Sequence, residues 1–417
     1  MSKYQSVRGT RDLLPNLKKS FRAIDEMAFK TAQKYGYNEI ETPLFEFSEV
    51  FHRSLGETSD AVSKETYTFT DRGGDSITLR PEGTAGVVRA FVSEGLAQLI
   101  PLKLYYYGPM FRYERPQKGR YRQFYQFGVE VLGLETPLAD IECLDLAWNI
   151  IKKLKLSERC VLEINTLGDA ESRVEYRQAL VGYLTPLKSQ LSPDSQIRLE
   201  KNPMRILDSK DEGDKKLLVN APLMKNFLNE KSNEFFNRVL EGLTHLKIPY
   251  KVNPKLVRGL DYYCHTVFEF TTTELGAQGA ILSGGRYDGL VEMLGGPKTA
   301  GVGWAAGVDR LADLCETTLT FEKDSTVYAF AAIGPKAELE ALRLASALTA
   351  KNKKCLSYPT GGLKKKLEKI SKLSETNANV FAILLFDQEN GSIEYKIKNF
   401  NTGEEALSSP IKILELE

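Results

Sequence analysis

The stretch from Lys103 to Gly133 concentrates arginines, carboxylates and aromatic rings at every second position. Side chains in a β-strand alternate between its two faces, so residues of even number share one face of each arm. Residues 115–119, RPQKG, contain turn-forming proline and glycine and join the two arms into a long hairpin. The even positions are Tyr106, Gly108, Met110, Arg112 and Glu114 on the first arm, and Arg120, Arg122, Phe124, Gln126, Gly128 and Glu130 on the second.

The odd positions of this hairpin are largely apolar and predict a face that packs against a hydrophobic core. The even face is polar, and one interpretation is a sheet face that is simply exposed to water. Such faces are usually rich in Lys, Glu, Thr and Ser, however, and this one combines arginines with glycines and a phenylalanine. Arginine offers a planar fork that matches phosphate oxygens, and glycine lets a ligand approach the backbone. We therefore interpret the even face as a binding surface for a polyanion that carries a flat ring.

Two further arginines, Arg258 and Arg310, stand beside glycines, although for either one alone a surface salt bridge is the simpler interpretation. The glycine-rich segments GGRYDG and GVGWAAGVDR match neither a phosphate loop nor a dinucleotide-binding fingerprint. We find no Ser-His-Asp or Cys-His pattern, and three histidines leave little room for metal ligation, so the sequence does not predict a protein nucleophile. A lysine cluster between positions 351 and 372 is typical of a solvated helix face, or of a local phosphate-binding patch.

Hydrophobic periodicity predicts the elements that would position these residues. The composition becomes polar, helical and rich in Lys, Asn, Glu and Ser from 170 to about 252, and a charged run occupies 321–325, so we expect domain borders there. We predict helices at 16–35, 83–96 and 138–154, a strand at 161–165, strand-like segments at 256–263, 266–272 and 282–290, a strand running into a helix at 301–314, and a strand at 327–334 that opens a final segment of alternating helix and strand.

The overall composition is that of a globular protein, with 417 residues, 42% hydrophobic and 27% charged, enough for two or three domains. A net charge of +1 gives no overall attraction to nucleic acid, so such contacts must come from local patches. Five cysteines without a CxxC spacing favour reduced thiols over disulfides or a zinc site. The N-terminus lacks an apolar signal region and no stretch approaches the ~20 apolar residues of a membrane span, so we expect a cytoplasmic protein without membrane contact.

Several motifs together resemble the class II aminoacyl-tRNA synthetases, and most closely the bacterial histidyl-tRNA synthetases. KYGYNEIETPLFE is similar to the first class motif, with Pro43 at the dimer interface; FRYE with RPQKGRYRQF is similar to the second motif, and GVDR to the third. The segments LRPEGT, LVRGLDYY, SGGRYDGL and RGTRDLLP match the histidine-specific family. Two conservative departures occur in the third motif: Asp309 stands where the family usually has glutamate, and Trp304 where phenylalanine is usual.

The resemblance implies an α+β fold: an antiparallel six- or seven-stranded sheet with flanking helices, a helical insertion, and a C-terminal α/β anticodon-binding domain, assembled as a homodimer. The expected boundaries are 1–169 and 253–320 for the two parts of the catalytic domain, 170–252 for the insertion, and 325–417 for the anticodon-binding domain.

The resemblance also implies a reaction. The carboxylate of L-histidine attacks the α-phosphate of ATP, and the histidyl group of the adenylate then passes to the 3′ end of tRNA(His). The nucleophile belongs to the substrate, so the protein supplies positioning and charge neutralisation. Mg²⁺ would bridge phosphate oxygens; its protein ligands are not identified.

The resemblance assigns each candidate site residue a role. Arg112 and Arg258 would be catalytic at the α-phosphate, and Arg115, Gln117 and Lys118 would meet the tRNA acceptor end. ATP would be bound by Arg112, Glu114, Arg120, Phe124 and Arg310; histidine would be bound by Glu82, Thr84, Arg112, Gln126, Glu130, Arg258, Tyr262, Tyr263 and Tyr287, with Glu130 and Tyr263 at the imidazole nitrogens.

Two other functions are compatible with parts of this pattern. A histidine-sensing regulatory subunit of ATP phosphoribosyltransferase would bind histidine without aminoacylating, but such paralogues lack the anticodon domain and parts of the ATP site. In this sequence all the ATP-site residues are present, and about 90 residues follow the third motif. The same intact site disfavours a non-catalytic RNA-binding protein.

Overall fold

The chain divides into two compact units, Met1–Leu319 and Thr320–Glu417, which are described separately below. The charged run at 321–325, expected as a domain border, lies outside the residues that the structure describes. In the described part of the chain, no helix combines the length and the apolar character needed to cross a membrane. The computed structural model describes residues 4–55, 65–115, 119–258, 262–275, 279–316, 326–375, 377 and 379–416.

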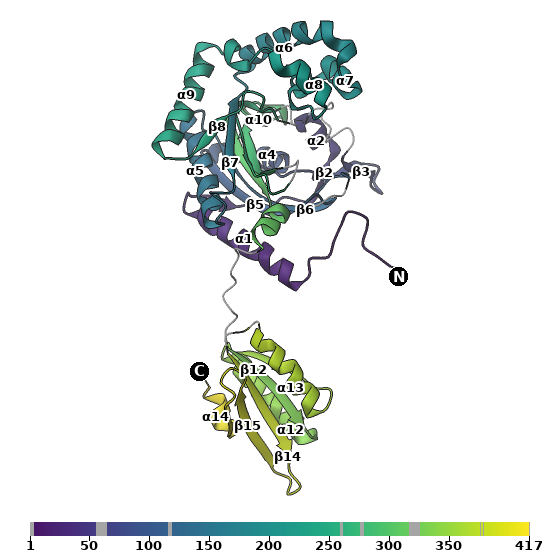
Figure 1. The fold of residues 1–417 in the computed structure, drawn as a ribbon, viewed down its shortest axis with the longest axis vertical. Coiled ribbons are helices and arrows are strands. Elements are labelled where there is room, and N and C mark those ends of the chain that lie inside the picture. The colour runs from purple at the N-terminus through teal and green to yellow at the C-terminus, as the bar shows by residue number, and fades with distance from the viewer. Residues whose placement is uncertain are drawn as a thin grey trace. The chain divides into compact units, whose positions relative to one another are not determined.

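An eight-stranded sheet forms the centre of the first unit (Figure 1). Its strands are β1 (Asn38–Glu39), β5 (Leu102–Phe111), β6 (Gln123–Leu132), β7 (Val161–Thr166), β8 (Tyr250–Val252), β9 (Cys264–Thr271), β10 (Ala280–Arg286) and β11 (Gly301–Gly307). They lie in the order β1-β5-β6-β11-β10-β9-β7-β8, and the six inner strands are antiparallel. The expectation of six or seven strands was too low, because β1 and β8 pair in parallel at the edges and are too short to carry a periodic pattern.

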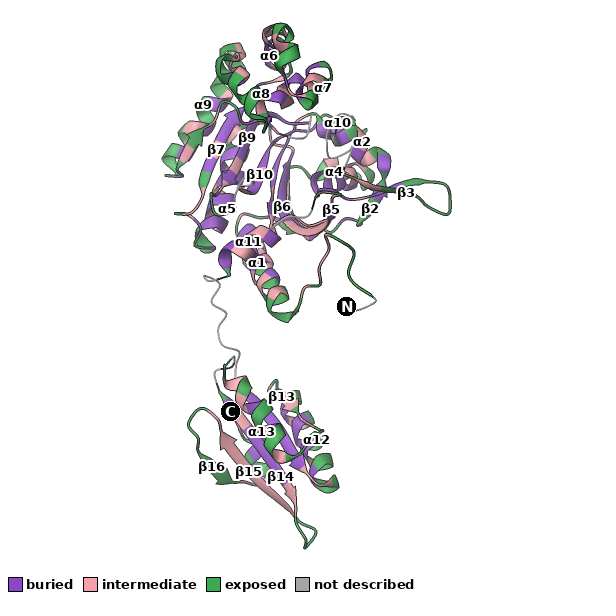
Figure 2. Ribbon diagram, turned by 45° about the vertical axis from the view of Figure 1, so that its right-hand side comes forward, coloured by how far each residue is buried: buried purple, intermediate pink, exposed green. Residues whose placement is uncertain are grey.

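One face of this sheet carries the main hydrophobic core, beneath α1 (Pro15–Gln33), α5 (Pro137–Lys153), α9 (Glu230–His245) and α11 (Val308–Cys315). Among the odd positions of the hairpin, Tyr105, Phe127 and Val129 are fully buried here, whereas Tyr107, Phe111 and Tyr125 are only partly buried. Tyr113 lies beyond the end of β5, and its side chain is half exposed. Figure 2 shows that the strands of this sheet are largely buried.

A second core backs the other side of the sheet and packs beneath α2 (Ser48–Leu55), α4 (Thr84–Ser93) and α10 (Leu290–Met293). Its members include Phe51 and Phe91 from the helices and Tyr287 from the turn after β10. A 3₁₀ turn, η1 (Leu96–Leu99), follows α4, and a small antiparallel sheet lies nearby in the order β2-β4-β3, formed by β2 (Phe45–Phe47), β3 (Tyr67–Thr70) and β4 (Ser76–Leu79).

The polar region after residue 169 is helical, as its composition predicts, with a small core of its own that includes Tyr176 and Leu180. The carboxylate of Asp214 is buried within it and accepts hydrogen bonds from the hydroxyls of Ser192, Ser195 and Ser209. By contrast, α9 packs on α5 and β8 pairs with β7, so both belong to the layers of the main sheet. The elements between them are α6 (Ala170–Leu184), η2 (Thr185–Gln190), α7 (Pro193–Lys201), η3 (Pro203–Asp208), α8 (Glu212–Leu217), η4 (Leu218–Asn220) and η5 (Met224–Phe227).

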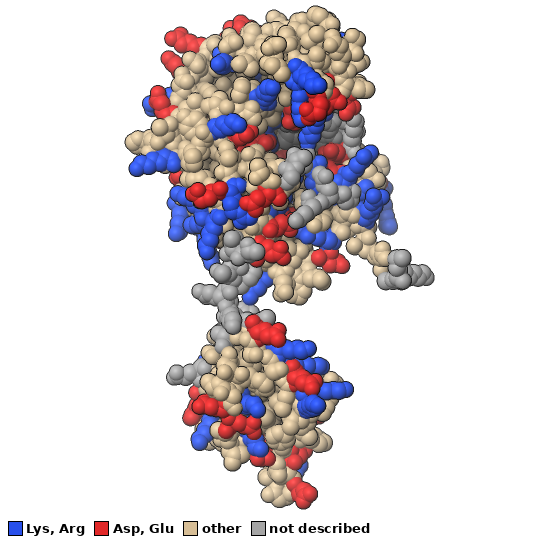
Figure 3. Space-filling view, viewed as in Figure 1, with Lys and Arg blue, Asp and Glu red and all other residues tan. Residues whose placement is uncertain are grey.

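The second unit is the predicted α/β fold, a five-stranded sheet in the order β13-β12-β14-β15-β16. The first three strands in this order are parallel and the last two antiparallel, and the sheet is buried by helices on both faces. Basic and acidic side chains are interspersed on the face shown in Figure 3. The elements are β12 (Val327–Ile333), α12 (Pro335–Ala350), β13 (Lys354–Ser357), α13 (Leu363–Ser371), η6 (Lys372–Glu375), β14 (Val380–Asp387), β15 (Ile393–Asn399), β16 (Glu405–Leu407) and α14 (Pro410–Leu414).

Candidate active site

A cavity of about 170 Å³ lies over the even-numbered side chains of β6 and the neighbouring strands β11 and β10. It collects side chains that the sequence analysis singled out in distant segments: Glu82, Thr84, Arg112, Glu114, Arg120, Phe124, Gln126, Arg258, Tyr262, Tyr263 and Arg310.

Three predicted site residues do not line this cavity, and two others fall outside the described residues. Glu130 and Tyr287 are fully buried behind its lining, and Arg115 is exposed to solvent. Gln117 and Lys118 lie outside the described residues, so the structure gives no account of the predicted contact with the tRNA acceptor end.

The hairpin is shorter than the alternation predicted. β5 ends at Phe111 and β6 begins at Gln123, so Arg112, Glu114 and Arg120 come from the irregular chain beyond the strand ends. Arg122 shares their even numbering but packs on the ring of Tyr113, with its guanidinium carbon 3.9 Å from the ring centre. Alternation therefore predicts the cavity-facing residues reliably only within the hydrogen-bonded strands. Beyond the strand ends, side-chain contacts determine where each residue points.

Three arginines and the ring of Phe124 line one end of the cavity. Arg112 donates from Nε to the Pro81 carbonyl at 2.8 Å, and its guanidinium carbon lies 5.3 Å from the centre of the Phe124 ring. Arg120 forms an ion pair with Glu114 at 2.9 Å. Arg310, from the first turn of α11, donates to the carbonyls of Gly119 and Ala280.

The charges at this end are unbalanced in favour of an anion. Burial lowers the pKa of Arg310, and the positive charges of Arg120 and Arg112 lower it further, while Glu114 acts in the opposite direction. Three guanidinium groups share one carboxylate, that of Glu114, so their mutual repulsion would be relieved by bound phosphate oxygens. The flat face of Phe124 adds a stacking surface for a base.

The opposite end is built around the buried carboxylate of Glu130 on β6. The Thr84 hydroxyl donates to its Oε1 at 2.7 Å, and the Tyr287 hydroxyl donates to its Oε2. Burial raises the pKa of Glu130 to about 8, a rise that the hydrogen bonds from Tyr287 and Thr84 partly oppose. Gly303 on β11 pairs with Glu130 on the adjacent strand β6. A Cβ at position 303 would lie 1.8 Å from Oε2 of Glu130, so the carboxylate needs a glycine there.

Glu82 joins the same end through the start of α4. Its carboxylate accepts hydrogen bonds from the backbone N–H groups of Thr84 and Ala85, at 2.7 and 2.8 Å. Burial raises the pKa of Glu82, and these backbone hydrogen bonds oppose the rise. Gln126, between the two ends, has a buried Oε1 for which the described residues provide no hydrogen-bond donor.

Arg258 lines the same cavity, and residues of β9 and β10 hold its side chain in place. It forms an ion pair with Glu269 on β9 and donates to the Ser283 hydroxyl on β10 at 3.0 Å. Its guanidinium carbon lies 5.5 Å from the centre of the Tyr263 ring. The sequence analysis did not identify Glu269 and Ser283; a carboxylate at an inward position of an otherwise apolar strand was the available signal.

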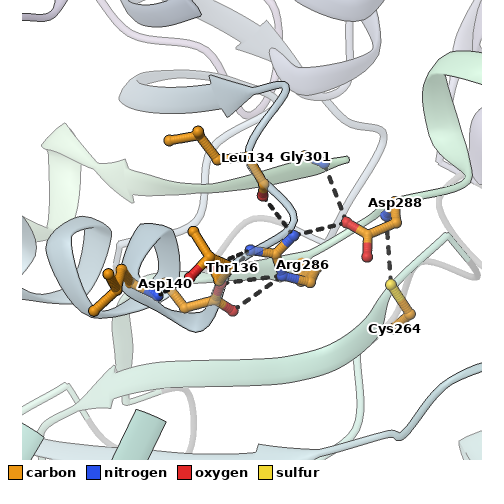
Figure 4. Close-up of polar contacts among 8 residues, drawn as sticks. Leu134, Thr136, Asp140, Cys264, Arg286, Asp288 and Gly301 are labelled. Atoms are coloured by element: carbon orange, nitrogen blue, oxygen red, sulfur yellow. Dashed lines mark hydrogen bonds and ion pairs between the residues drawn. The ribbon is translucent and has the colours of Figure 1, made fainter. Parts of the chain in front are cut away.

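A buried ionic network fixes the backbone on both sides of Tyr287 (Figure 4). Arg286 and Asp140 are both fully buried and form an ion pair, and Arg286 also donates to the carbonyls of Leu134 and Thr136. Asp288 accepts from Arg286 at 2.9 Å and from the backbone of Gly301 at 3.2 Å. The network joins the chain after β6 to the chain after β10, which are the strands that lead to Glu130 and Tyr287.

Comparisons with known proteins identify the family of the chain. The family model described as histidyl-tRNA synthetase matches residues 9–171 and 204–311. The histidine–tRNA ligase of Rhodospirillum rubrum is 50% identical, with 97% of this chain and 96% of that protein covered. The histidine–tRNA ligase of Wolbachia pipientis from Culex pipiens is 47% identical, with 99% of both chains covered.

The fold gives the same result. The crystal structure of apo histidyl-tRNA synthetase from S. aureus superposes with a TM-score of 0.80 at 35% identity, over 99% of each chain. A structure from Bacillus halodurans described as an ATP phosphoribosyltransferase regulatory subunit/histidyl-tRNA synthetase has a TM-score of 0.64 at 22% identity, covers 92% of this chain and 99% of its own, and shares the fold alone. The family model and the full-length relatives show that this chain belongs to the histidyl-tRNA synthetase family.

Proposed function

We propose how the cavity carries out histidine–tRNA ligase activity, the activity of the full-length relatives. A carboxylate oxygen of L-histidine attacks the α-phosphorus of ATP, and the bond from that phosphorus to the bridging oxygen breaks to release pyrophosphate. The terminal ribose hydroxyl of tRNA(His) then attacks the acyl carbon and releases AMP. The observation that carries the assignment is one cavity with three arginines at one end and Thr84 at the other, where the Thr84 hydroxyl donates to the buried carboxylate of Glu130 behind the lining.

At the arginine end, we assign the triphosphate to Arg112, Arg120 and Arg310. Arg112 would hold the α-phosphate, and Arg120 and Arg310 the terminal phosphates. Phe124 would stack on the adenine, with Arg310 on its other face, and Glu114 would accept a hydrogen bond from the adenine amino group. The excess of positive charge there supports this assignment.

At the other end, Glu130 and Tyr263 would pair with the two imidazole nitrogens, and Tyr262 would line the pocket. The α-amino group would be held by Glu82, Thr84 and Gln126, and the unused acceptor of Gln126 supports this role. Tyr287 donates to Glu130 and would orient that carboxylate from behind. Each carboxylate oxygen of Glu130 has a second lone pair, so it can accept from the imidazole as well.

Arg258 would bridge the histidine carboxylate and the α-phosphate. These two groups are both anionic and must approach each other, so a cation between them lowers the barrier more than it strengthens binding. Glu269 and Ser283 hold the guanidinium at this point. A positioned cation supplies charge stabilisation without reorganisation during the reaction.

Mg²⁺ fits this site as an ion that is carried mainly by the substrate. The described residues contain no group of three or more potential metal-ligating side chains. Mg²⁺ commonly keeps several waters and binds through one or two carboxylates together with phosphate oxygens. The ion would neutralise phosphate charge, and we expect chelation to stop pyrophosphate exchange until Mg²⁺ is restored.

A homodimer is supported by an apolar surface beside the segment that resembles the first class motif. Phe45, Phe47 and Phe69 on β2 and β3 are each about half exposed. Exposed aromatic side chains clustered on one small sheet are typical of a protein interface. Sedimentation of the purified protein at several concentrations would measure the assembly.

A reducing, cytoplasmic location is supported by the five cysteines, all of which are free thiols. Cys143 and Cys315 are completely buried, where burial raises the pKa of the Cys143 thiol far above its usual value and keeps it unreactive. Fractionation of cells that express a tagged chain would test the location.

Histidine-dependent exchange of pyrophosphate into ATP tests the function directly. We expect exchange with histidine, and charging of tRNA(His) when the tRNA is added. A histidine-binding regulatory subunit would bind histidine and give no exchange. Exchange with another amino acid in place of histidine would contradict the assignment.

The division of labour between the two units is a second part of the proposal, with 325–417 as the anticodon-binding domain and 170–252 as the insertion. The residues assigned to ATP and histidine all lie between Glu82 and Arg310. A chain that ends near Phe321 should therefore retain histidine-dependent exchange if it remains a folded dimer. It should charge tRNA more slowly, mainly because tRNA binds more weakly.

Unchanged charging at low tRNA concentration would contradict the anticodon role of the second unit. Loss of exchange in a truncated chain shown by sedimentation to be dimeric and folded would mean that the second unit shapes the active site. Full-length protein, measured in parallel, is the control for both results.

A further inference from the structure

The segment before α1 contacts the arginine end of the cavity, although it contributes no residue to the cavity lining. This segment contains Gly9 and Arg11 of the RGTRDLLP motif, to which neither the sequence analysis nor the reaction gave a role. The Gly9 carbonyl accepts a hydrogen bond from the backbone N–H of Arg122 at 2.7 Å. The segment is therefore tied to the second arm of the hairpin just before β6 begins.

Arg11 connects two pieces of chain that are far apart in the sequence. Its Nη1 donates to the Tyr121 hydroxyl at 2.8 Å, and its Nη2 donates to Oδ1 of Asp309 at 2.7 Å. The guanidinium carbon also lies 3.9 Å from the centre of the Tyr121 ring. The other oxygen of Asp309 accepts from the backbone N–H of Tyr125 at 2.8 Å, which ties α11 to the start of β6.

Both partners of Arg11 are direct neighbours of arginines that we assign to ATP. Tyr121 follows Arg120, and Asp309 precedes Arg310. Tyr121 and Asp309 also line the cavity. The Arg11 guanidinium therefore links the two chain segments that carry Arg120 and Arg310, and it does not itself line the cavity.

A planar guanidinium suits this position for a physical reason. It presents donors in a fixed fork, so the two hydrogen bonds set the distance between Tyr121 and Asp309. Asp309 is almost fully buried, and a buried carboxylate without its cation is strongly destabilised. Removal of Arg11 would leave Asp309 to find another partner and would release the arm that carries Arg120.

We propose that Arg11 is a positioning residue for the ATP end of the site, which holds Arg120 and Arg310 at a fixed separation through Tyr121 and Asp309. The proposal rests on the assignment of Arg120 and Arg310 to ATP. A misplacement of about 1 Å at a reacting group can cost on the order of 100-fold in rate.

The test is histidine-dependent pyrophosphate exchange with Arg11→Gln. Arg8→Gln is the matched control, because Arg8 is an exposed arginine of the same segment. We expect Arg11→Gln to raise the KM for ATP by roughly 10-fold or more and to lower kcat, with the KM for histidine within about 2-fold of wild type. Arg8→Gln should leave all three constants unchanged. A role in fold stability alone would lower the melting temperature and leave the ATP KM of the folded protein unchanged.

Two further variants keep the proposal testable if Arg11→Gln fails to fold. Tyr121→Phe removes only the hydroxyl acceptor and should reproduce part of the rise in ATP KM. Arg11→Lys keeps the charge beside Asp309 without the fork, and combining it with Tyr121→Phe should add little further effect, because both act through one contact.

The proposal is overturned if the ATP KM of Arg11→Lys and Tyr121→Phe stays at the wild-type value while Arg310→Ala raises it. If Arg310→Ala and Arg120→Ala also leave the ATP KM unchanged, the underlying assignment of these arginines to ATP is wrong instead.

Discussion

The two ends of the cavity, which we propose bind ATP and histidine, are built differently. At the ATP end, the side chains of Arg112 and Arg120 are 28% and 30% exposed and come from irregular chain beyond the strand ends. At the histidine end, Glu130 is completely buried within β6, and its hydroxyl partners come from α4 and from the turn after β10. The first end presents charged, partly exposed side chains from irregular chain. The second presents hydrogen-bonding groups from the buried interior of the sheet.

The difference follows from what each end must distinguish. A triphosphate carries several negative charges, and arginines attract it from many geometries even in the presence of water. An imidazole ring differs from other side chains in where its nitrogens lie, so its recognition requires buried partners that stay unpaired with the wrong ligand. Variants at the two ends should therefore fail in different ways.

The largest effect is expected on amino-acid discrimination. Wild type should prefer histidine over phenylalanine by roughly 10⁴–10⁵, because the apolar ring would leave Glu130 and Tyr263 without partners. Glu130→Gln replaces an acceptor with a donor-bearing amide and should lose most of this preference, as measured by exchange with each amino acid. Glu114→Gln at the ATP end is the matched control and should preserve the preference. An equal loss of the preference for histidine in both variants would contradict the distinction between the two ends.

Arg258 lies between the ends and should affect chemistry more than binding. Arg258→Ala should slow adenylate formation by about 10²–10³, as expected for the loss of one transition-state charge partner. The affinity for histidine, measured by calorimetry, should fall much less. If affinity and rate fall in proportion, Arg258 is a ground-state ligand and belongs to the histidine end.

At the ATP end, the loss of a stacking surface should have a moderate effect that is confined to one substrate. Phe124→Leu should raise the KM for ATP by about 10-fold, because a stacked base contributes roughly 1–3 kcal/mol. The KM for histidine should not change. A comparable rise in both constants would show that Phe124 supports the sheet rather than the adenine.

The smallest effect is a pH dependence of stability that arises from Glu130. Its pKa is about 8 in the folded protein, above the ordinary value of 4.5, so the folded state holds this proton more tightly than the unfolded chain. Stability from this group is therefore fully present below the ordinary pKa and is lost as pH rises through about 8.

Glu130→Gln cannot ionise and should escape this loss. Without histidine, the melting temperature of the variant relative to wild type should rise by roughly 5 °C or more between roughly pH 5 and 9, because a pKa raised from 4.5 to about 8 corresponds to about 5 kcal/mol. If the difference in melting temperature between the variant and wild type stays constant across this pH range, Glu130 is already ionised at low pH.

Part of the site was predictable from the sequence because its signal is local. Alternation with a period of two placed Phe124 and Gln126 on one face, and the structure confirms that both line the cavity. The same pattern failed for Arg122, which packs on Tyr113 beyond the end of the ladder. One short edge strand, β8, was missed because a segment of three residues carries no period.

The sequence by itself determined which residue types would face a polyanion and a flat ring, because strand alternation and turn chemistry act between near neighbours. The tertiary structure decided which of these side chains reach the cavity and which stand behind it. Glu130 meets Thr84 across 46 positions, Asp140 meets Arg286 across 146, and Arg11 meets Asp309 across 298. Contacts at such separations form only when the packed layers bring distant segments together, and no local pattern encodes them.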